Sequence, residues 1–179
     1  GGNFFIAFIL ATSLGMFAGL INGLLVTKIG IPSIVATIGT LFFWRGLVNV
    51  ISQGSGVAIV DVADGTWHHT LFVEKIFNKI PAQFIWFIAL TALMQWVYRY
   101  HKFGNHIHFV GDNKASSQMM GFNVDNVKII AFVQLGFFSA LAGIFTMYEM
   151  LYFWPTQGSG LMLTTLAAVF VGGTSVFGG

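Results

Sequence analysis

The chain of 179 residues is 56% hydrophobic and only 8% charged, with a mean hydropathy of +0.80. Soluble domains carry about 25% charged residues, and a soluble fold of this size would expose apolar patches large enough to drive aggregation. The composition therefore excludes a soluble globular domain and predicts an all-α fold, a polytopic bundle of transmembrane helices.

The net charge of +2 comes from few ionisable groups and does not indicate nucleic acid as a partner. The absence of cysteine excludes disulfides and thiolate metal sites. The chain begins with Gly1 and stops just after a long apolar run, at Gly178-Gly179, so we expect it to be part of a longer protein with one continuous membrane region over residues 1–179.

The first membrane span is predicted at residues 4–26, which contain no charged side chain and suffice to cross a hydrocarbon core of about 30 Å. Within it, Gly15, Gly19 and Gly23 recur every four residues. This spacing places three positions without side chains on one helix face, where another helix can approach closely. It predicts helix packing, and it leaves open whether the partner helix belongs to the same subunit or to a second one.

The second span is predicted at residues 31–51, after a break that ends in Pro32, a residue that suits the first turn of a helix. It contains Arg45 and Asn49. An arginine at membrane depth costs at least about 2.5 kcal/mol on insertion scales. Arg45 is therefore expected either to snorkel or pair structurally, or to line a pathway.

Residues 53–80 mix acidic, basic and apolar side chains and are predicted to form an extramembrane loop with one short amphipathic helix. The third span is predicted at residues 82–98 and the fourth at residues 129–152. The apolar run at residues 161–171 is short for a full crossing and is expected to be a partial or re-entrant span.

A polar segment at residues 99–128 separates the third and fourth spans and holds four of the eight Lys and Arg residues of the chain. Membrane proteins keep Lys and Arg in short loops on the cytoplasmic side. The segment is therefore predicted to be cytoplasmic, and the alternation of spans then places Lys28 inside and residues 53–80 outside.

The polar segment has an internal order. Residues 111–113 carry turn chemistry, a short helix is predicted at residues 115–120, and Gly121 is predicted to end that helix in the left-handed conformation. The helix offers small and soft side chains, which suit insertion into a groove of another protein. A plain connector between two spans is the alternative.

No catalytic pattern accompanies these spans. The chain lacks a Gly-Lys dipeptide and hence a Walker A loop, and it contains no HExxH, GxSxG or GxGxxG motif. The pairs His68-His69 and His106/His108 lack further ligands at metal-binding spacing, so we expect solvated loop histidines and no metal site. These absences favour transport or a structural membrane role over an enzyme.

Three stretches follow one family pattern in the same order. Residues 22–46 contain NG, IPSIVATIGT and RG; residues 103–128 contain FGN, GDNKA, GFNV and a lysine; residues 166–179 read LAAVFVGGTSVFGG. On these residues the chain resembles the permease subunits of monosaccharide ABC importers of the ribose, xylose and galactose type.

The resemblance implies a multi-pass protein of the bacterial inner membrane that forms the translocation pathway of an ATP-driven sugar importer. The implied partners are a separate ABC ATPase beneath the cytoplasmic loop, a second permease subunit, identical or different, and an extracytoplasmic sugar-binding protein. No cofactor is predicted. The residues expected to couple this chain to the ATPase are Gly111, Asn113, Ala115 and Gly121.

A sugar pathway needs hydrogen-bonding groups and aromatic faces inside the spans, although the same residue types also bond one helix to another. The candidates are Asn22, Trp44, Asn49, Gln95, Gln134 and Glu149.

Two rival functions remain open, an ion-coupled secondary carrier or channel and a non-transporting membrane scaffold built on the glycine seam. Only Glu149 is an acid inside a predicted span, and it lies near the outer end, which argues against proton coupling.

Overall fold

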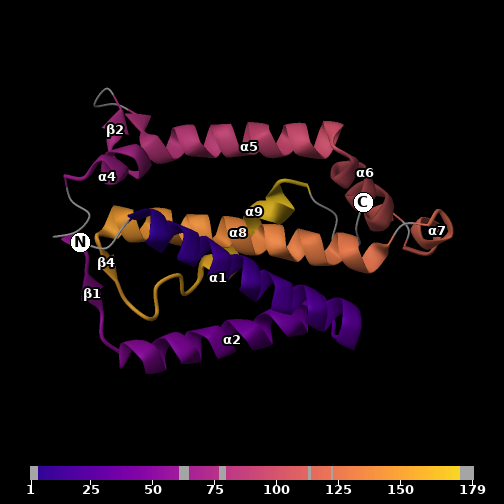
Figure 1. Cartoon of the computed structure of the whole chain (residues 1–179), viewed down its shortest axis with the longest axis horizontal. Coiled ribbons are helices and arrows are strands. Elements are labelled where there is room, and N and C mark those ends of the chain that lie inside the picture. Colours follow the sequence, from indigo (N-terminus) through magenta and orange to yellow (C-terminus); the bar gives the residue numbers. More distant parts are fainter. Residues whose placement is uncertain (1–3, 61–64, 77–79, 113, 122, 174–179) are drawn as a thin grey trace.

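The computed structural model describes residues 4–60, 65–76, 80–112, 114–121 and 123–173, and it is predominantly helical, as the composition predicted. Four long helices lie side by side with their axes in roughly the same direction (Figure 1). They are α1 (Phe4–Leu24), α2 (Ser33–Ser52), α5 (Ala82–Tyr100) and α8 (Val124–Met150).

The short elements gather at the two ends of these helices (Figure 1). One end, called the α4 end below, carries β1 (Val57–Ala58), α4 (Trp67–Phe72), β2 (Lys75–Ile76), β3 (Ile80–Pro81) and β4 (Tyr152–Phe153). The other end, called the α7 end, carries the π-helical turn η1 (Leu25–Ile29), α6 (Lys102–Asp112) and α7 (Lys114–Met119). The described parts of residues 53–80, predicted to lie outside, and of the segment predicted to be cytoplasmic therefore lie at opposite ends of the bundle (Figure 1).

The centre of the fold is the contact between α1 and α8. A methyl group placed on Gly15 would lie 2.5 Å from the carbonyl oxygen of Gly136, and one on Gly19 would overlap the carbonyl group of Phe132. On Gly23 it would lie 3.0 Å from the Cα atom of Ile129. The two backbones thus touch directly, and the partner of the predicted glycine face is a helix of the same chain.

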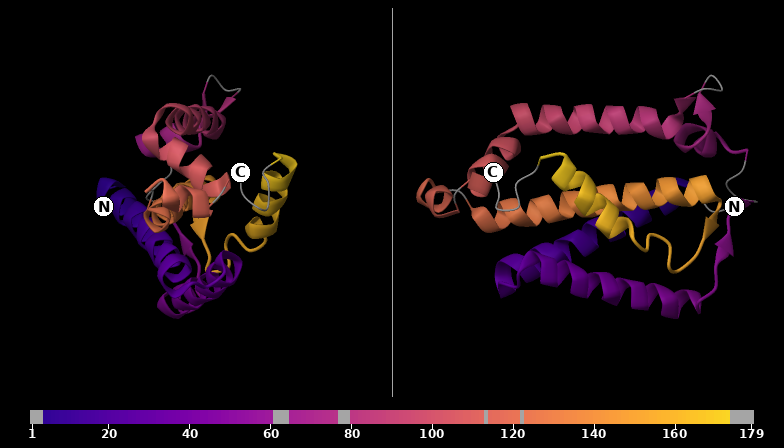
Figure 2. Two further views of the ribbon diagram at one scale, coloured as in Figure 1. Left: turned by 90° about the vertical axis from the view of Figure 1, so that its right-hand side faces the viewer. Right: turned by 180° about the vertical axis from the view of Figure 1, so that it is seen from behind.

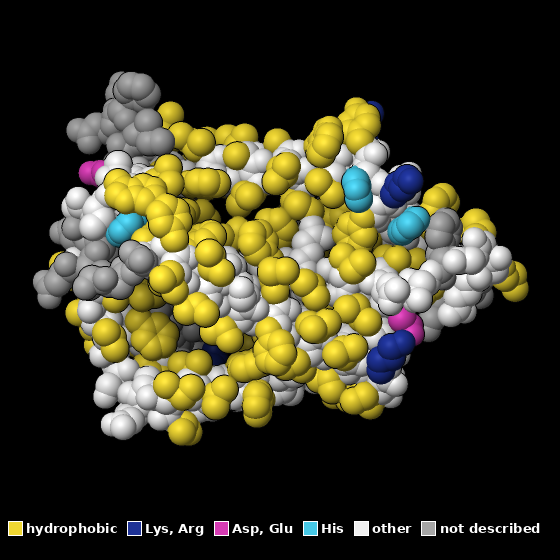
Figure 3. All heavy atoms as spheres, viewed as in Figure 1, with side chains coloured by type: hydrophobic (Ala, Val, Ile, Leu, Met, Phe, Trp, Pro, Cys, Tyr) yellow, Lys and Arg dark blue, Asp and Glu magenta, His cyan; other side chains and the backbone are white. Residues whose placement is uncertain are grey.

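Most apolar side chains of the long helices point away from this contact. Among the described residues, three helical stretches are long and apolar enough to cross a membrane, Phe4–Ile29, Ser33–Ser52 and Val124–Met150, and few of their residues are buried. Apolar side chains cover most of the face shown in Figure 3. Such a surface is stable in hydrocarbon and not in water.

Helices α5 and α9 are not among the helices that are both long and apolar enough to cross a membrane. Helix α5 has 19 residues, but Gln83, Gln95 and Arg99 lower its hydropathy, so its crossing of the membrane stays a prediction. Helix α9 (Leu161–Val171) has 11 residues, all exposed, which at about 1.5 Å each is too short for a crossing. It lies on the side of α8 opposite to α1 (Figure 2).

Helix ends follow local chemistry. The π-helical turn continues α1 to Ile29 and ends at Gly30, whose φ of 82° is left-handed, and Pro32 then precedes the first residue of α2. Helix α8 begins at Val124, earlier than the predicted start at residue 129, because Asn123 caps it.

Candidate functional site

Helix α6 turns the chain away from α5 at the α7 end. Gly104 is buried at this turn, and a side chain there would overlap the backbone of Tyr98. The half-buried residues Phe103, Ile107 and Val110 recur at helical spacing around and after Gly104, so α6 is an amphipathic helix with one face toward the protein.

One prediction about this segment is wrong. Gly111 and Asp112, expected to form a turn, are the last two residues of α6, which continues beyond its last apolar position at Val110. Of the residues expected to couple to an ATPase, Gly111 lies at this helix end, Ala115 lies in α7, and Asn113 lies outside the described residues.

Helix α7 is the short helix predicted at residues 115–120, shifted by one residue. Its anchor is Ser117, which is 0% exposed and donates a hydrogen bond from Oγ to the carbonyl oxygen of Phe109 at 2.7 Å. On the outer side, Met119 is 88% exposed. Gly121 then ends the helix with a φ of 82°, the left-handed conformation that was predicted. The turn therefore holds Met119 outward on a fixed support, and the adjacent Met120 is 54% exposed.

The return into α8 is held by two polar contacts. Asn123 accepts a hydrogen bond at Oδ1 from the backbone N–H of Asn126 at 3.0 Å, as an N-cap does. Lys28 of η1 bonds the carboxylate of Asp125 at 3.3 Å. Both contacts tie the segment that follows α7 to the bundle.

Replacing the cap tests this anchoring. Asn123→Ala is expected to lower the free energy of unfolding by about 1 kcal/mol, because the first-turn N–H of α8 loses its acceptor. Equilibrium unfolding of the full-length protein in detergent measures this value. Asn123→Asp keeps the acceptor and should retain the stability; an equal loss in both variants would contradict the capping role.

Three of the candidate pathway residues lie on α1 and α2. Asn22 accepts a 2.7 Å hydrogen bond from the hydroxyl of Thr40, which joins the two helices. Asn49 donates to the carbonyl oxygen of Arg45 within α2. The indole Nε1 of Trp44 is buried and has no hydrogen-bond partner in the described structure.

The other three lie on α5 and α8. Gln134 donates to the Sδ atom of Met94 at 3.3 Å, and Glu149 accepts from Gln83 at 3.3 Å near the α4 end. Gln95 is exposed. The six candidates thus fall into two groups on either side of the α1–α8 contact, and the structure does not gather them into one pathway.

An aromatic cluster at the α4 end was not foreseen from the sequence. Phe72 of α4 is only 6% exposed, and its ring lies 5.3 Å from that of Phe145, 5.9 Å from that of Tyr148 and 5.9 Å from that of Trp86. Phe8 of α1 stacks on the same ring at 6.3 Å. The cluster joins α4 to α1, α5 and α8.

The prediction of solvated loop histidines is wrong for His68. It lies in α4, half-buried, with its ring stacked on that of Phe4 at 4.6 Å and its Nδ1 2.7 Å from the hydroxyl of Thr66. Its ring contacts with Phe4 and Tyr148 explain why it is half-buried. Within the described ranges, no three His, Cys, Asp or Glu side chains converge as metal ligands would.

Comparison with known families settles the class. The whole chain, residues 1–179, matches the family described as the permease component of branched-chain amino acid transport systems. The chain belongs to this permease family. The predicted resemblance to importer permeases is thereby confirmed, and so is the expectation of a transport component instead of an enzyme.

Individual relatives are permeases too. The chain is 36% identical over 180 residues to the autoinducer 2 import system permease protein LsrC of Photorhabdus luminescens, which covers 100% of this chain and 53% of the relative. It is 35% identical over 170 residues to the LsrC protein of Yersinia pseudotuberculosis, and this match covers 94% of this chain and 47% of the relative. The permease chain therefore spans about half the length of these relatives. No solved structure matches it.

Proposed function

We propose that this permease chain forms part of the translocation pathway of an ATP-driven importer for a small hydroxylated solute of the sugar class. The observation that carries the proposal is α7, a short helix at the α7 end that is anchored by buried Ser117 and presents Met119 outward. A flexible, exposed methionine on a fixed support suits insertion into an apolar groove of a separate ATPase.

The solute class rests on the candidate pathway residues. Apart from Glu149, which bonds Gln83 near the α4 end, they carry amides and an indole, and the pair Asn22–Thr40 joins two apolar helices. Neutral donors and acceptors suit a neutral hydroxylated solute better than an ion. The family description names branched-chain amino acids and the relatives import autoinducer 2, so family membership by itself leaves the solute open.

The other proposed partners are assigned from the α4 end and the α7 end of the bundle. A second permease subunit, identical or different, would complete the pathway. An extracytoplasmic sugar-binding protein would deliver solute at the α4 end. There, Val57 of β1 pairs with Phe153 of β4, which joins the segment after α2 to the segment after α8. In this arrangement the α7 end faces the cytoplasm of a bacterium, and the chain crosses the inner membrane several times.

Uptake by cells that express the full-length permease and its neighbouring genes tests the proposal. Uptake of labelled ribose, galactose or autoinducer 2 should stop when arsenate depletes ATP and continue when a protonophore collapses the proton gradient. An ATPase should also co-purify with the tagged permease in mild detergent. Uptake that survives ATP depletion and fails with the protonophore would instead show an ion-coupled carrier, and the lack of any uptake or ATPase would favour a scaffold.

A further inference from the structure

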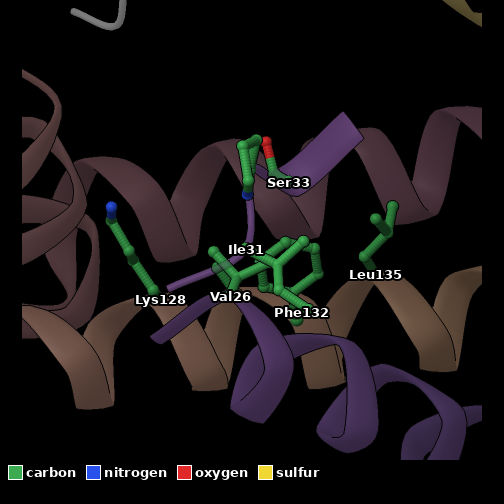
Figure 4. Close-up of a pocket in the computed structure, with 8 residues that line it drawn as sticks. Val26, Ile31, Ser33, Lys128, Phe132 and Leu135 are labelled. Carbon is green, nitrogen blue, oxygen red and sulfur yellow. The ribbon is translucent and has the colours of Figure 1, made fainter. Parts of the chain in front are cut away.

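A cavity of about 500 Å³ lies at the α7 end, between α8 and the turn that connects η1 to α2. Val26, Ile31 and Pro32 form one wall, with the hydroxyl group of Ser33 at the start of α2. Figure 4 shows Val26 and Ile31 grouped with Phe132 of α8. The lining is mainly apolar, and no part of the proposed translocation pathway accounts for it.

The α8 wall has a polar end and an apolar end. Lys128, Ala131, Phe132 and Leu135 line the cavity at helical spacing, so they form one stripe along α8. At about 1.5 Å per residue, Lys128 and Leu135 are roughly 10 Å apart along the axis. Figure 4 shows Lys128 toward one end of the cavity and Leu135 toward the other. The lysine lies nearer the start of α8 at Val124, so the charge sits at the end of the helix and the apolar lining runs toward the middle of the span.

Within the described ranges of the chain, no residue forms an ion pair with the ammonium group of Lys128. The nearby carboxylate of Asp125 is bonded to Lys28 at 3.3 Å, and this is the sole ion pair among the residues that the structure describes. A lysine one turn into a membrane span reaches the headgroup layer with its side chain. The cavity therefore offers a positive charge at headgroup depth and apolar walls below it.

We propose that this cavity binds one anionic phospholipid of the adjoining leaflet, with its phosphate on Lys128 and an acyl chain along Ala131, Phe132 and Leu135. An acyl chain is the apolar molecule that surrounds a membrane helix at this depth, and a basic group beside an apolar groove selects an anionic headgroup. The bound lipid would fill the space between α2 and α8, two helices that otherwise make little contact. The inference needs only the membrane location of the permease and does not depend on the solute or on the ATPase.

The test uses the full-length permease in nanodiscs made from equal parts of phosphatidylglycerol and phosphatidylcholine, released gently and analysed by native mass spectrometry. Wild type should retain one phosphatidylglycerol in strong preference to phosphatidylcholine. Lys128→Gln should reduce this preference about tenfold, and Lys128→Arg should restore it. Ala131→Phe, which keeps the charge but fills the cavity, should also lose the lipid. Lys102→Gln removes an exposed charge of α6 at the same end and should change nothing.

Several results would overturn the proposal. An equal loss in Lys102→Gln and Lys128→Gln would show that only surface charge attracts the lipid. Displacement of phosphatidylglycerol by inorganic phosphate would show a site for free anions, with no role for the acyl chain. Retention of the lipid in Ala131→Phe, or a second protein chain in place of the lipid, would show that the cavity is not its binding site. Circular dichroism of each variant confirms that the helices remain folded, and Lys128→Arg keeps the test decisive should Ala131→Phe not fold.

Discussion

Gly19→Ala is expected to lower the free energy of unfolding of the permease by about 3 kcal/mol. The new methyl group would overlap the carbonyl group of Phe132 and lie 3.0 Å from the Cα atom of Val133. These are backbone atoms of a helix, so no side chain can move aside. Relief requires α1 and α8 to separate, which also loosens the contact of Gly15 with Gly136. Overpacking usually costs about 1–3 kcal/mol. Because the obstacle here is backbone, we expect a cost at the upper end of this range.

Gly143→Ala is the matched control, because Gly143 lies on α8 and a methyl group there would meet no atom within 4 Å. Replacing a helical glycine in open space stabilises the helix by up to about 1 kcal/mol. The two variants should therefore change stability in opposite directions. Equilibrium unfolding of the full-length protein, with SDS added to a mild detergent and helicity followed by circular dichroism, measures both. Equal effects of the two variants would contradict the close α1–α8 contact.

This contact shows how far local spacing can predict a fold. The repeat of Gly15, Gly19 and Gly23 predicts a packing face because it depends on residues within one helix. It carries no information on the partner helix. Gly136 is an isolated glycine within α8, and only the path of the chain between the two helices brings it against Gly15. A close approach over more than a hundred residues has no signal in a single sequence.

The polar segment shows a competition between two local signals. The prediction at residues 111–113 rested on turn chemistry alone, whereas in the structure α6 carries the apolar positions Phe103, Ile107 and Val110 and continues to Asp112. Further on, Gly121 was predicted correctly because a left-handed residue after a short helix strongly favours glycine.

The pathway candidates and the aromatic cluster depended on tertiary contacts. The chemistry of Asn22 identified a residue that needs a partner inside the membrane, but the partner, Thr40, is on another helix. Phenylalanine is so frequent here, at 20 of 179 residues, that no pattern singled out Phe72 as the centre of a cluster. Both would have required knowledge of which helices are neighbours.

Met119→Glu is expected to reduce ATPase co-purification and solute uptake at least tenfold while the stability of the permease changes by less than about 0.5 kcal/mol. Met119 is 88% exposed, so the folded permease itself gains little from this side chain. Burying a methionine in a partner's groove contributes about 1.5–3 kcal/mol, and burying an unpaired carboxylate there is strongly unfavourable. Since 1.4 kcal/mol corresponds to a tenfold change in affinity, the loss should exceed one order of magnitude.

Two further variants make this result specific. Met119→Leu keeps an apolar side chain of similar volume and should retain most of the co-purified ATPase. Thr70→Glu adds the same charge to an exposed position of α4, at the opposite end of the bundle, and should leave the ATPase bound. If Met119→Glu also retained the ATPase and uptake, then α7 would be a connector between α6 and α8. Loss of the ATPase in Thr70→Glu as well would mean that added charge impairs the permease generally, since the α4 end lies a full helix length from α7 (Figure 1). The burial of Ser117 and the exposure of Met119 favour loss of the ATPase in Met119→Glu alone. A plain connector would not need a fixed support for an apolar side chain that faces outward.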